Sequence, residues 1–219
     1  MAIAFFDLDR TLIAKNSASL WVKSELRDGE ISTWQAVRAG TWLLRYRLGF
    51  ANMEDAVRKA ITGLKGKEEA PVKARAFAFY DREIHQLYRP GAHAVLRKHR
   101  KSGDQLVLLT SSSAYMSEKV CAALELDAVL CTSFEVDREG RYTGRPVEPL
   151  CYGQGKVAHA QAYADGHGVS LQDCAFYTDS TADLPLMEVV GLPVAVNPDP
   201  RLLKTARSRG WEVVDWGDA

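Results

Sequence analysis

Two aspartates stand at the end of an apolar run near the start of the chain. Residues 2–6 read Ala-Ile-Ala-Phe-Phe, and Asp7-Leu8-Asp9 follows directly. The run predicts a short buried strand over residues 3–8, and side chains two positions apart on a strand point the same way. Both carboxylates then project from the end of the strand, where open α/β sheets bind ligands and where carboxylate oxygens suit Mg²⁺. A polar strand end followed by a turn, with Thr11 capping the next helix, is the alternative that this segment leaves open.

The composition is that of a globular protein with no strong charge preference. Of the 219 residues, 47% are hydrophobic and 26% are charged, and the formal net charge is zero. We therefore expect no general attraction to nucleic acid or to an anionic membrane. The longest uncharged stretch, residues 105–117, is too short to span a bilayer, and the N-terminus lacks the basic start of a signal peptide. We expect a cytoplasmic protein, and the sequence does not indicate its oligomeric state.

Metal and redox motifs built on cysteine or histidine are absent from the sequence. The cysteines form no C-x-x-C pair, and the five histidines show no H-E-x-x-H spacing. We therefore expect no zinc site, so that any metal would bind to carboxylates. Three of the cysteines lie in or beside apolar stretches and are expected to be reduced core residues. The cysteines are Cys121, Cys131, Cys151 and Cys174.

Apolar periodicity and turn residues divide the chain into a helical stretch and an alternating stretch. After the first strand, four helices are predicted at residues 17–27, 33–48, 53–62 and 68–87, separated by turns that contain glycine. Beyond residue 90, strands alternate with helices, which predicts a parallel sheet covered on both faces. Strands are expected at 105–110, 127–132, 174–178, 193–196 and 211–214, helices at 91–102, 114–125, 155–165, 182–190 and 200–209, and a polar hairpin at 135–147.

Three further signals fall just past a predicted strand or at the start of a predicted helix. They are Thr110, Lys156, and the pair Asp179 and Asp183. Each is weak alone, because a threonine after a strand is usually a helix cap and a lone lysine is usually solvated. The glycines before Lys156 do not form a Walker A loop, which needs different residues around the lysine. The order of these signals along the chain is far more specific than any one of them.

The order of these polar residues along the chain resembles that of the haloacid dehalogenase superfamily of phosphohydrolases, and within it the phosphoserine-phosphatase-like branch. The stretch Asp7-Leu8-Asp9-Arg10-Thr11-Leu12 matches the first motif, Thr110 the second, Lys156 the third and Asp179-Ser180-x-x-Asp183 the fourth. Asn197-Pro198-Asp199 is also similar to the branch, whereas Thr178 replaces a frequent glycine. The resemblance implies an α/β fold with a Rossmann-like parallel core at residues 1–14 and 88–219, helices on both faces, and a helical-bundle cap at 15–87.

The resemblance also implies a Mg²⁺-dependent phosphomonoesterase that acts through an aspartyl-phosphate. Asp7 would be the nucleophile, and Asp9 the general acid and base. Lys156 and Thr110 would bind the phosphoryl oxygens, together with the backbone N–H groups of Leu8, Asp9 and Ser111. Asp7, Asp179 and the backbone carbonyl of Asp9 would hold Mg²⁺, and Asp183 would orient this set.

The expected substrate is a small phosphorylated metabolite. Phosphoserine phosphatases carry an acidic residue nine positions after the nucleophile, where it recognises the substrate ammonium. This chain has Asn16 there, which makes Asn16 a candidate substrate-binding residue. Because a neutral amide lacks the charge, we expect weak activity on free phosphoserine. Aromatic and basic residues of the cap either pack the bundle or line a substrate pocket, and the sequence does not choose between these roles. They are Trp21, Trp34, Trp42, Arg45, Tyr46 and Arg47.

Two alternatives to a hydrolase remain open at this level. A phosphotransferase would use the same intermediate, with a second alcohol attacking it in place of water. A phosphate-binding module without turnover belongs to a different class, and the complete set of acids and lysine argues against it.

Overall fold

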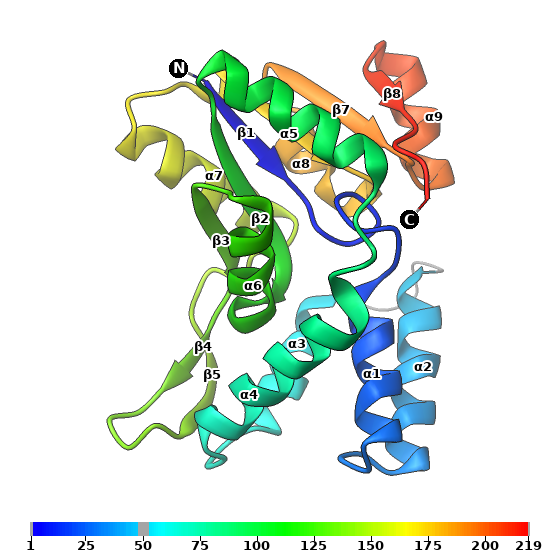
Figure 1. The fold of residues 1–219 in the computed structure, drawn as a ribbon, viewed down its shortest axis with the longest axis vertical. Helices are drawn as coiled ribbons and strands as arrows, with labels where there is room; N and C mark the ends of the chain where they lie inside the picture. The colour runs from blue at the N-terminus through cyan, green and yellow to red at the C-terminus, as the bar shows by residue number, and fades with distance from the viewer. Residues whose placement is uncertain (1, 48–52, 219) are drawn as a thin grey trace.

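The core of the protein is one six-stranded parallel sheet. The computed structural model describes residues 2–47 and 53–218. The strands follow the order β3-β2-β1-β6-β7-β8, and every pairing in this sheet is parallel (Figure 1). They are β1 (Ile3–Phe6), β2 (Gln105–Ser113), β3 (Ala128–Thr132), β6 (Ala175–Thr178), β7 (Leu192–Val196) and β8 (Glu212–Val214). The predicted α/β class is confirmed.

Helices cover both faces of the sheet, because alternate residues of each strand point to opposite sides. In β1, Ala4 and Phe6 belong to a core cluster with α5 and α6, whereas Ile3 and Phe5 belong to a second cluster with α7, α8 and α9. All four of these residues are fully buried, as expected for a strand covered on both sides. The helices are α5 (Pro90–Ser102), α6 (Ala114–Leu124), α7 (Gln154–Gly166), α8 (Leu184–Met187) and α9 (Pro200–Arg209), and a 3-10 turn precedes β6 (Leu171–Asp173).

A helical insertion separates β1 from α5. It holds α1 (Ser17–Arg27), α2 (Thr33–Arg47), α3 (Met53–Thr62) and α4 (Glu69–Phe79), and α4 continues as a π-helix (Tyr80–Ile84). The first and third helices have their predicted bounds, and Leu48, the predicted end of the second, lies outside the described residues. The fourth was predicted as one regular helix, and this is wrong at its C-terminal end, because side-chain periodicity does not distinguish a π-turn from an α-turn.

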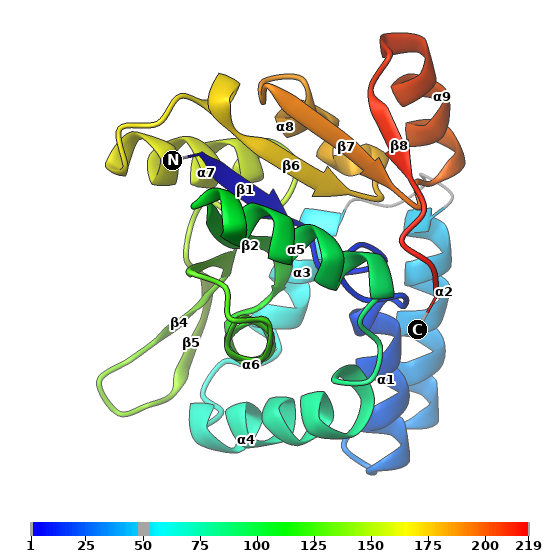
Figure 2. The same ribbon diagram turned by 45° about the horizontal axis from the view of Figure 1, so that its top comes forward.

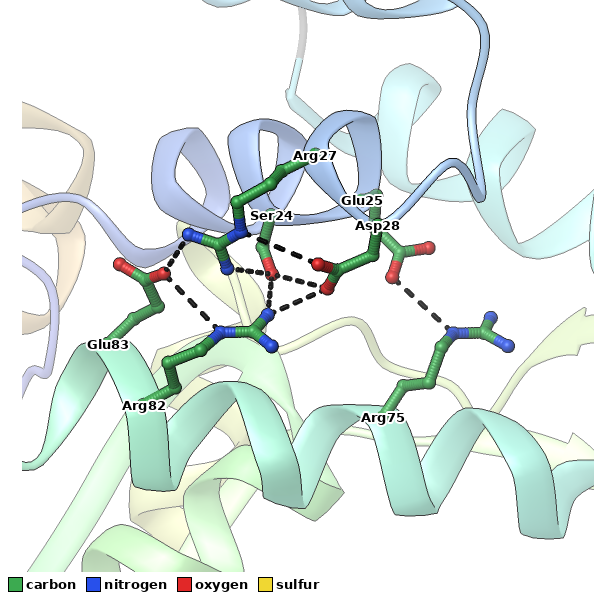
Figure 3. Close-up of polar contacts among 7 residues, drawn as sticks. All are labelled: Ser24, Glu25, Arg27, Asp28, Arg75, Arg82 and Glu83. Carbon is green, nitrogen blue, oxygen red and sulfur yellow. Dashed lines mark hydrogen bonds and ion pairs between the residues drawn. The ribbon is translucent and has the colours of Figure 1, made fainter.

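The insertion lies on the side of the sheet toward which the strand ends of β1 and β7 point (Figures 1 and 2). Ion pairs join α1 to α4 and the π-helix that follows it (Figure 3). The shortest are Arg82 Nη2 to Asp28 Oδ2 and Arg27 Nη1 to Glu83 Oε1, each at 2.7 Å. These side chains are 25–52% exposed, so each pair stabilises the packing by at most about 1 kcal/mol. The division into a core (residues 1–14 and 88–219) and a cap (15–87) stays a prediction.

A hairpin connects the insertion to the core. It consists of β4 (Phe134–Val136) and β5 (Tyr142–Pro146), which pair antiparallel as predicted. The Gly66 N–H donates to the Tyr142 carbonyl at 2.8 Å, and the Tyr142 N–H donates to the Lys67 carbonyl at 3.0 Å. The Tyr142 hydroxyl donates to the Tyr115 hydroxyl on α6 at 3.0 Å. The hairpin is therefore bonded both to the insertion and to α6.

Two expectations from composition can be compared with this structure. The four cysteines are free thiols, and where three were expected in the core, two are buried, Cys151 and Cys174. Among residues 2–47 and 53–218, no helix has the length and apolar character needed to cross a bilayer.

Candidate active site

Polar residues that follow three neighbouring strands meet at one edge of the sheet. Strands β2, β1 and β6 are adjacent. Asp7 and Asp179 directly follow β1 and β6, and Thr110 lies in β2, at the end that was predicted for that strand. Because parallel strands end at the same edge, the fold brings these side chains together. The predicted end of β2 at residue 110 is wrong, since the strand continues to Ser113 with a register shift against β3 after Thr110.

Lys156 lies at the centre of this group. Its Nζ donates to Asp7 Oδ1 and to Asp183 Oδ2, each at 2.8 Å. All three side chains are buried, and Lys156 is only 3% exposed. Burial by itself would lower the pKa of Lys156, but the charges of Asp183 and Asp7 outweigh it and raise the pKa above its usual value. The ammonium therefore stays charged, and the alternative of a solvated lysine is wrong.

Two glycines at the start of α7 allow the close packing that positions Lys156 in the site. A Cβ on Gly155 would lie 1.8 Å from the Leu150 carbonyl oxygen, so no other residue fits there without moving the backbone. Gly153 has φ +51°, in the left-handed region that favours glycine. The two glycines therefore allow the chain to turn tightly into the first turn of α7, which carries Lys156.

Asp7 and Asp179 are buried acids with raised pKa values. Burial raises the pKa of Asp7 to about 7, although Lys156 opposes this shift. Burial raises the pKa of Asp179, and the charges of Asp7 and Asp183 raise it further. The charge of Arg10 opposes the rise in the pKa of Asp179. Within the described residues, the Asp179 carboxylate has no hydrogen bond or ion pair. A buried carboxylate with no hydrogen bond or ion pair among the described residues, beside a second carboxylate, suits a divalent cation that prefers oxygen ligands.

Side chains alone do not complete such a cation site. In the described part of the chain, no three His, Cys, Asp or Glu side chains are grouped closely enough to hold a metal ion. Asp183 is also engaged elsewhere, because its Oδ2 accepts from Lys156 and, at 2.6 Å, from the Thr178 hydroxyl. The side-chain ligands available are thus Asp7 and Asp179, and further ligands would have to be backbone carbonyls or water.

Asp9 lies against the N-terminus of α1. Its Oδ1 accepts from the Ser17 N–H at 2.8 Å, and its Oδ2 accepts from the Asn16 amide at 3.1 Å. Burial raises the pKa of Asp9, although the bonds from Ser17 oppose the shift. A half-buried carboxyl with a raised pKa, fixed in orientation, is suited to donate and accept a proton.

Asn16 has a structural role that sequence reasoning missed. Its Oδ1 accepts from the N–H and from the hydroxyl of Ser19, each at 2.9 Å, so Asn16 is the N-cap of α1. Its amide nitrogen holds Asp9 at the same time. The Asn-Ser-Ala-Ser pattern before an apolar turn was a usable N-cap signal. The predicted contact of Asn16 with substrate stays a prediction.

Thr11 lies in a turn that follows β1 and does not cap a helix. The N–H groups of Thr11 and Ile13 both donate to the Leu8 carbonyl, at 3.3 and 3.1 Å. Thr11 is fully buried, and its hydroxyl has no hydrogen-bond partner among the residues that the structure describes. Because Asn16 caps the next helix, the capping role for Thr11 is wrong.

Two further residues support the second acidic loop. The Asp199 carboxylate accepts from the N–H and hydroxyl of Thr181 and also caps α9, and its own N–H donates to the Asp179 carbonyl at 2.8 Å. Thr178, which departs from the family pattern, instead supplies the hydroxyl bond to Asp183. The predicted helix at 182–190 begins as a 3-10 turn (Thr181–Asp183) before α8.

The remaining predicted residues lie in several different environments. Thr110 is buried, and its hydroxyl accepts from the Ser112 N–H at 3.2 Å.

Among the aromatic residues of the insertion, Trp21 packs edge-on against Phe79, with the ring centroids 5.1 Å apart, which favours a packing role. Trp34 is 68% exposed and therefore does not pack the bundle. The side chains of Arg45, Tyr46 and Arg47 lie outside the described part of the structure. Contacts of phosphate with the N–H groups of Leu8, Asp9 and Ser111 stay predictions.

A buried lysine held between two acids, at the ligand-binding edge of a parallel sheet, is the kind of site that can stabilise a transferring phosphoryl group. The profile of the haloacid dehalogenase-like hydrolase family matches residues 4–188. The chain belongs to this family.

Several relatives carry the names of phosphatases or hydrolases. Phosphoserine phosphatase SerB1 of Mycobacterium tuberculosis is 32% identical over 220 residues, which covers 98% of this chain and 71% of the relative. A histidinol-phosphatase of Neisseria meningitidis is 28% identical, with 98% of both chains covered. The protein is accordingly an enzyme, a phosphatase of this family.

Solved structures agree on the fold. A protein of unknown function from Bordetella pertussis Tohama I superposes with a TM-score of 0.88 at 31% identity, with 99% of both chains covered. A substrate-bound phosphoserine phosphatase superposes with a TM-score of 0.70 at 17% identity, covering 97% of this chain and 92% of that one. At that identity, the second similarity establishes the fold alone.

Proposed function

We propose that this protein hydrolyses the phosphate monoester of a small metabolite, with Asp7 as the nucleophile. The observation that carries the proposal is Lys156, buried and bonded to both Asp7 and Asp183 at 2.8 Å. A phosphate dianion and a carboxylate about 4 Å apart repel by about 4 kcal/mol per pair of unit charges at an effective dielectric near 20. A fixed ammonium beside the nucleophile offsets this repulsion and is already oriented before the substrate arrives.

Asp7 and Asp9 divide the chemistry between them. A carboxylate oxygen of Asp7 attacks phosphorus, the bond from phosphorus to the ester oxygen breaks, and Asp9 donates its proton to the departing alcohol. Water then attacks the aspartyl-phosphate, and Asp9 accepts the proton of that water. Inorganic phosphate leaves, and both carboxyls return to their starting states. The two bonds from the start of α1 keep Asp9 in place for both proton transfers.

Mg²⁺ is the proposed cofactor. Asp7, Asp179 and the backbone carbonyl of Asp9 would hold it, and the buried Asp179 carboxylate, which has no hydrogen bond or ion pair among the described residues, supports this assignment. When bound, the ion would neutralise charge on the phosphoryl oxygens. Asp183, held by Lys156 and Thr178, would orient Lys156.

Mg²⁺ should raise the melting temperature of the wild-type protein. A ligand present at 100 times its Kd stabilises the folded state by about 2.7 kcal/mol, which corresponds to roughly 5–10 °C for a chain of this size. Asp179→Asn should remove most of that shift, since it replaces a carboxylate ligand with a neutral amide. Thermal melts with and without Mg²⁺ test this directly. An equal shift in wild type and Asp179→Asn would contradict the assignment.

Ca²⁺ should also bind but should support turnover poorly, because it prefers more ligands.

Asn16→Ser should separate the two roles of Asn16. Serine is an equally good N-cap, so the melting temperature should change little, but the amide bond to Asp9 is lost. We expect about a 10-fold loss of kcat with an alkyl phosphate, the scale of one hydrogen bond to a charged group. The loss with an aryl phosphate should be smaller, because a good leaving group needs little protonation. Asn16→Ala, which also loses the cap, should cost about 1 kcal/mol in stability. Equal losses with both substrates would argue against Asn16 holding the general acid.

The substrate is best found by a phosphate-release screen with Mg²⁺ present. An aryl phosphate first establishes turnover, and a panel of small phosphorylated metabolites then ranks substrates by kcat/KM. The names of the relatives make phosphoserine and histidinol phosphate necessary members of the panel. We expect free phosphoserine to be a weaker substrate than glycerol phosphate, because Asn16 carries no negative charge for the ammonium. No release from any member would refute the proposed hydrolase.

A phosphotransferase is the second candidate, and the same panel distinguishes it. Adding an acceptor alcohol should leave substrate consumption and phosphate release equal for a hydrolase. Phosphate release that falls below substrate consumption, with a new phosphate ester as product, would indicate transfer.

We also propose that residues 15–87 form the cap that selects the substrate, a role supported by the bonds from Asn16 and Ser17 to Asp9.

A further inference from the structure

Arg89 is a buried arginine outside the groups assigned above. It lies between the π-helix and α5 and is 5% exposed. Its Nε donates to the Arg10 carbonyl at 3.2 Å, and its Nη1 donates to the Gly217 carbonyl and, at 2.8 Å, to Asp218 Oδ1. One guanidinium thus joins the loop that follows Asp9 to a segment more than two hundred positions further along the chain.

The loop that Arg89 contacts has an unusual backbone. Arg10, between Asp9 and Thr11, has φ +59°, in the left-handed region that a long side chain rarely adopts. Such a conformation persists only where the surrounding structure fixes it. Arg89 supplies two of the fixing bonds, because its Nε binds the Arg10 carbonyl and its backbone N–H binds the Leu12 carbonyl at 2.9 Å.

Residues 215–218, called the strap here, hold Arg89 from the other side. In Figures 1 and 2 the end of the chain runs beside the loop after β1 and the start of α5. Trp216 is buried, its carbonyl accepts from the Gly91 N–H at 3.0 Å, and its ring lies 5.5 Å from that of Tyr177. The Asn197 side chain binds both Asp215 and the Trp216 N–H. The strap is therefore fixed to the ends of β6 and β7.

Gly91 is the position that admits the strap. A Cβ there would lie 2.6 Å from the Cβ and Cγ of Trp216. Gly91 belongs to α5 and does not have a positive φ, so its lack of a side chain matters for the approach of Trp216 and not for backbone conformation. Any larger residue must push Trp216, and with it Gly217, away from Arg89.

We propose that Arg89, held by the strap, is a positioning residue that fixes the catalytic loop from Asp7 to Thr11. Arg89 touches neither Asp7 nor Asp9, and it acts through the backbone of Arg10. Two of the three acceptors of its guanidinium come from the strap. Displacing the strap and replacing Arg89 should therefore have the same effect on the loop. This inference rests on the proposed roles of Asp7 and Asp9.

The test compares Arg89→Met with Gly91→Ala, singly and combined, at a temperature where each variant is folded. A misplacement of about 1 Å in a catalytic group can cost about 10²-fold in rate. We expect kcat to fall about 10–100-fold in Arg89→Met and about 5–20-fold in Gly91→Ala, with KM within about twofold of wild type. The double variant should lose little more than Arg89→Met alone, because both changes break the same connection.

Matched controls remove similar groups elsewhere. Arg209→Met deletes an arginine that pairs with Glu188 on the surface, and Gly166→Ala adds a Cβ at the end of α7, where among the described residues no atom outside the backbone of that helix lies within 4 Å. Both should keep kcat within about twofold of wild type, the range expected for surface changes away from the site. Wild-type kcat in Arg89→Met, or fully additive losses in the double variant, would overturn the proposal.

Amide hydrogen exchange gives a readout that does not depend on turnover. The amides of residues 10–13 should exchange faster in Arg89→Met and in Gly91→Ala than in the two controls. If Arg89→Met does not fold, Gly91→Ala carries the same test without touching the arginine. Unchanged exchange of these amides in a folded variant would refute the positioning role. Failure of the wild type to release phosphate would refute the proposed hydrolase alone.

Discussion

Asp7→Asn should abolish phosphate release and leave the fold intact. An amide cannot form the covalent phosphoryl intermediate, so we expect a loss on the order of 10⁴-fold or more in kcat, as for other nucleophile replacements. The stability change should be small. The new amide would no longer form an ion pair with Lys156, but Lys156 keeps Asp183 at 2.8 Å, and the burial cost that raises the pKa of Asp7 to about 7 is removed. Steady-state kinetics and thermal melts on the same preparation measure both effects.

Acid quenching provides a second check on the nucleophile. Wild-type enzyme mixed with a labelled phosphate ester should retain protein-bound phosphate that hydroxylamine releases, as an acyl phosphate does. Asp7→Asn should retain none, whereas Asp9→Asn should retain label with an aryl phosphate, because that leaving group needs little protonation. Label bound to Asp7→Asn at the wild-type level would mean that another residue is the nucleophile.

The sequence predicted most of the fold because its signals are local and repeated. The short apolar runs of β1, β2 and β6 form buried strands, and alternate residues of each strand pack in the two core clusters on opposite faces of the sheet. Glycines end helices such as α5 and α9. The π-helix after α4 and the 3-10 turn before α8 were missed, since apolar spacing alone does not separate these turns from α-helix. The end of β2 was placed too early because Ser111 to Ser113 look like a cap.

At the site too, the types of residue could be predicted from the sequence, whereas the hydrogen bonds between them could not. Asp7, Asp179, Lys156 and Asp183 could be predicted as site residues because the proposed chemistry needs those residue types after strands and at helix starts, and the structure brings Lys156 into contact with Asp7 and Asp183. The bond from Thr178 to Asp183 and the double role of Asn16 depend on which side chains the fold brings within hydrogen-bond distance. The contact between Arg89 and the strap joins residues 128 and 129 positions apart. No local pattern encodes such a pairing, which only the assembled sheet creates.

Lys156→Met should lower kcat by about 10²–10³-fold, the typical cost of losing one fixed electrostatic contact at a reacting oxygen. The structure adds a second expected effect. Lys156 is buried between Asp7 and Asp183, and removing one member of a buried ion pair typically costs about 3–5 kcal/mol. The variant should therefore lose both activity and stability.

The stability loss in Lys156→Met should depend on pH. Lys156 lowers the pKa of Asp7 against the effect of burial, so without it the folded-state pKa of Asp7 rises further above its ordinary value of 3.8. A carboxyl with a raised folded pKa binds its proton more tightly when folded, and the associated stability is lost as pH rises through that pKa. Because Asp7 in the wild type already has a folded pKa of about 7, the melting temperature of Lys156→Met relative to wild type should fall as the pH rises above about 7. Lys204→Met, at an exposed position on α9, should match wild type at every pH. A Lys156→Met protein with wild-type turnover would remove the lysine from the mechanism.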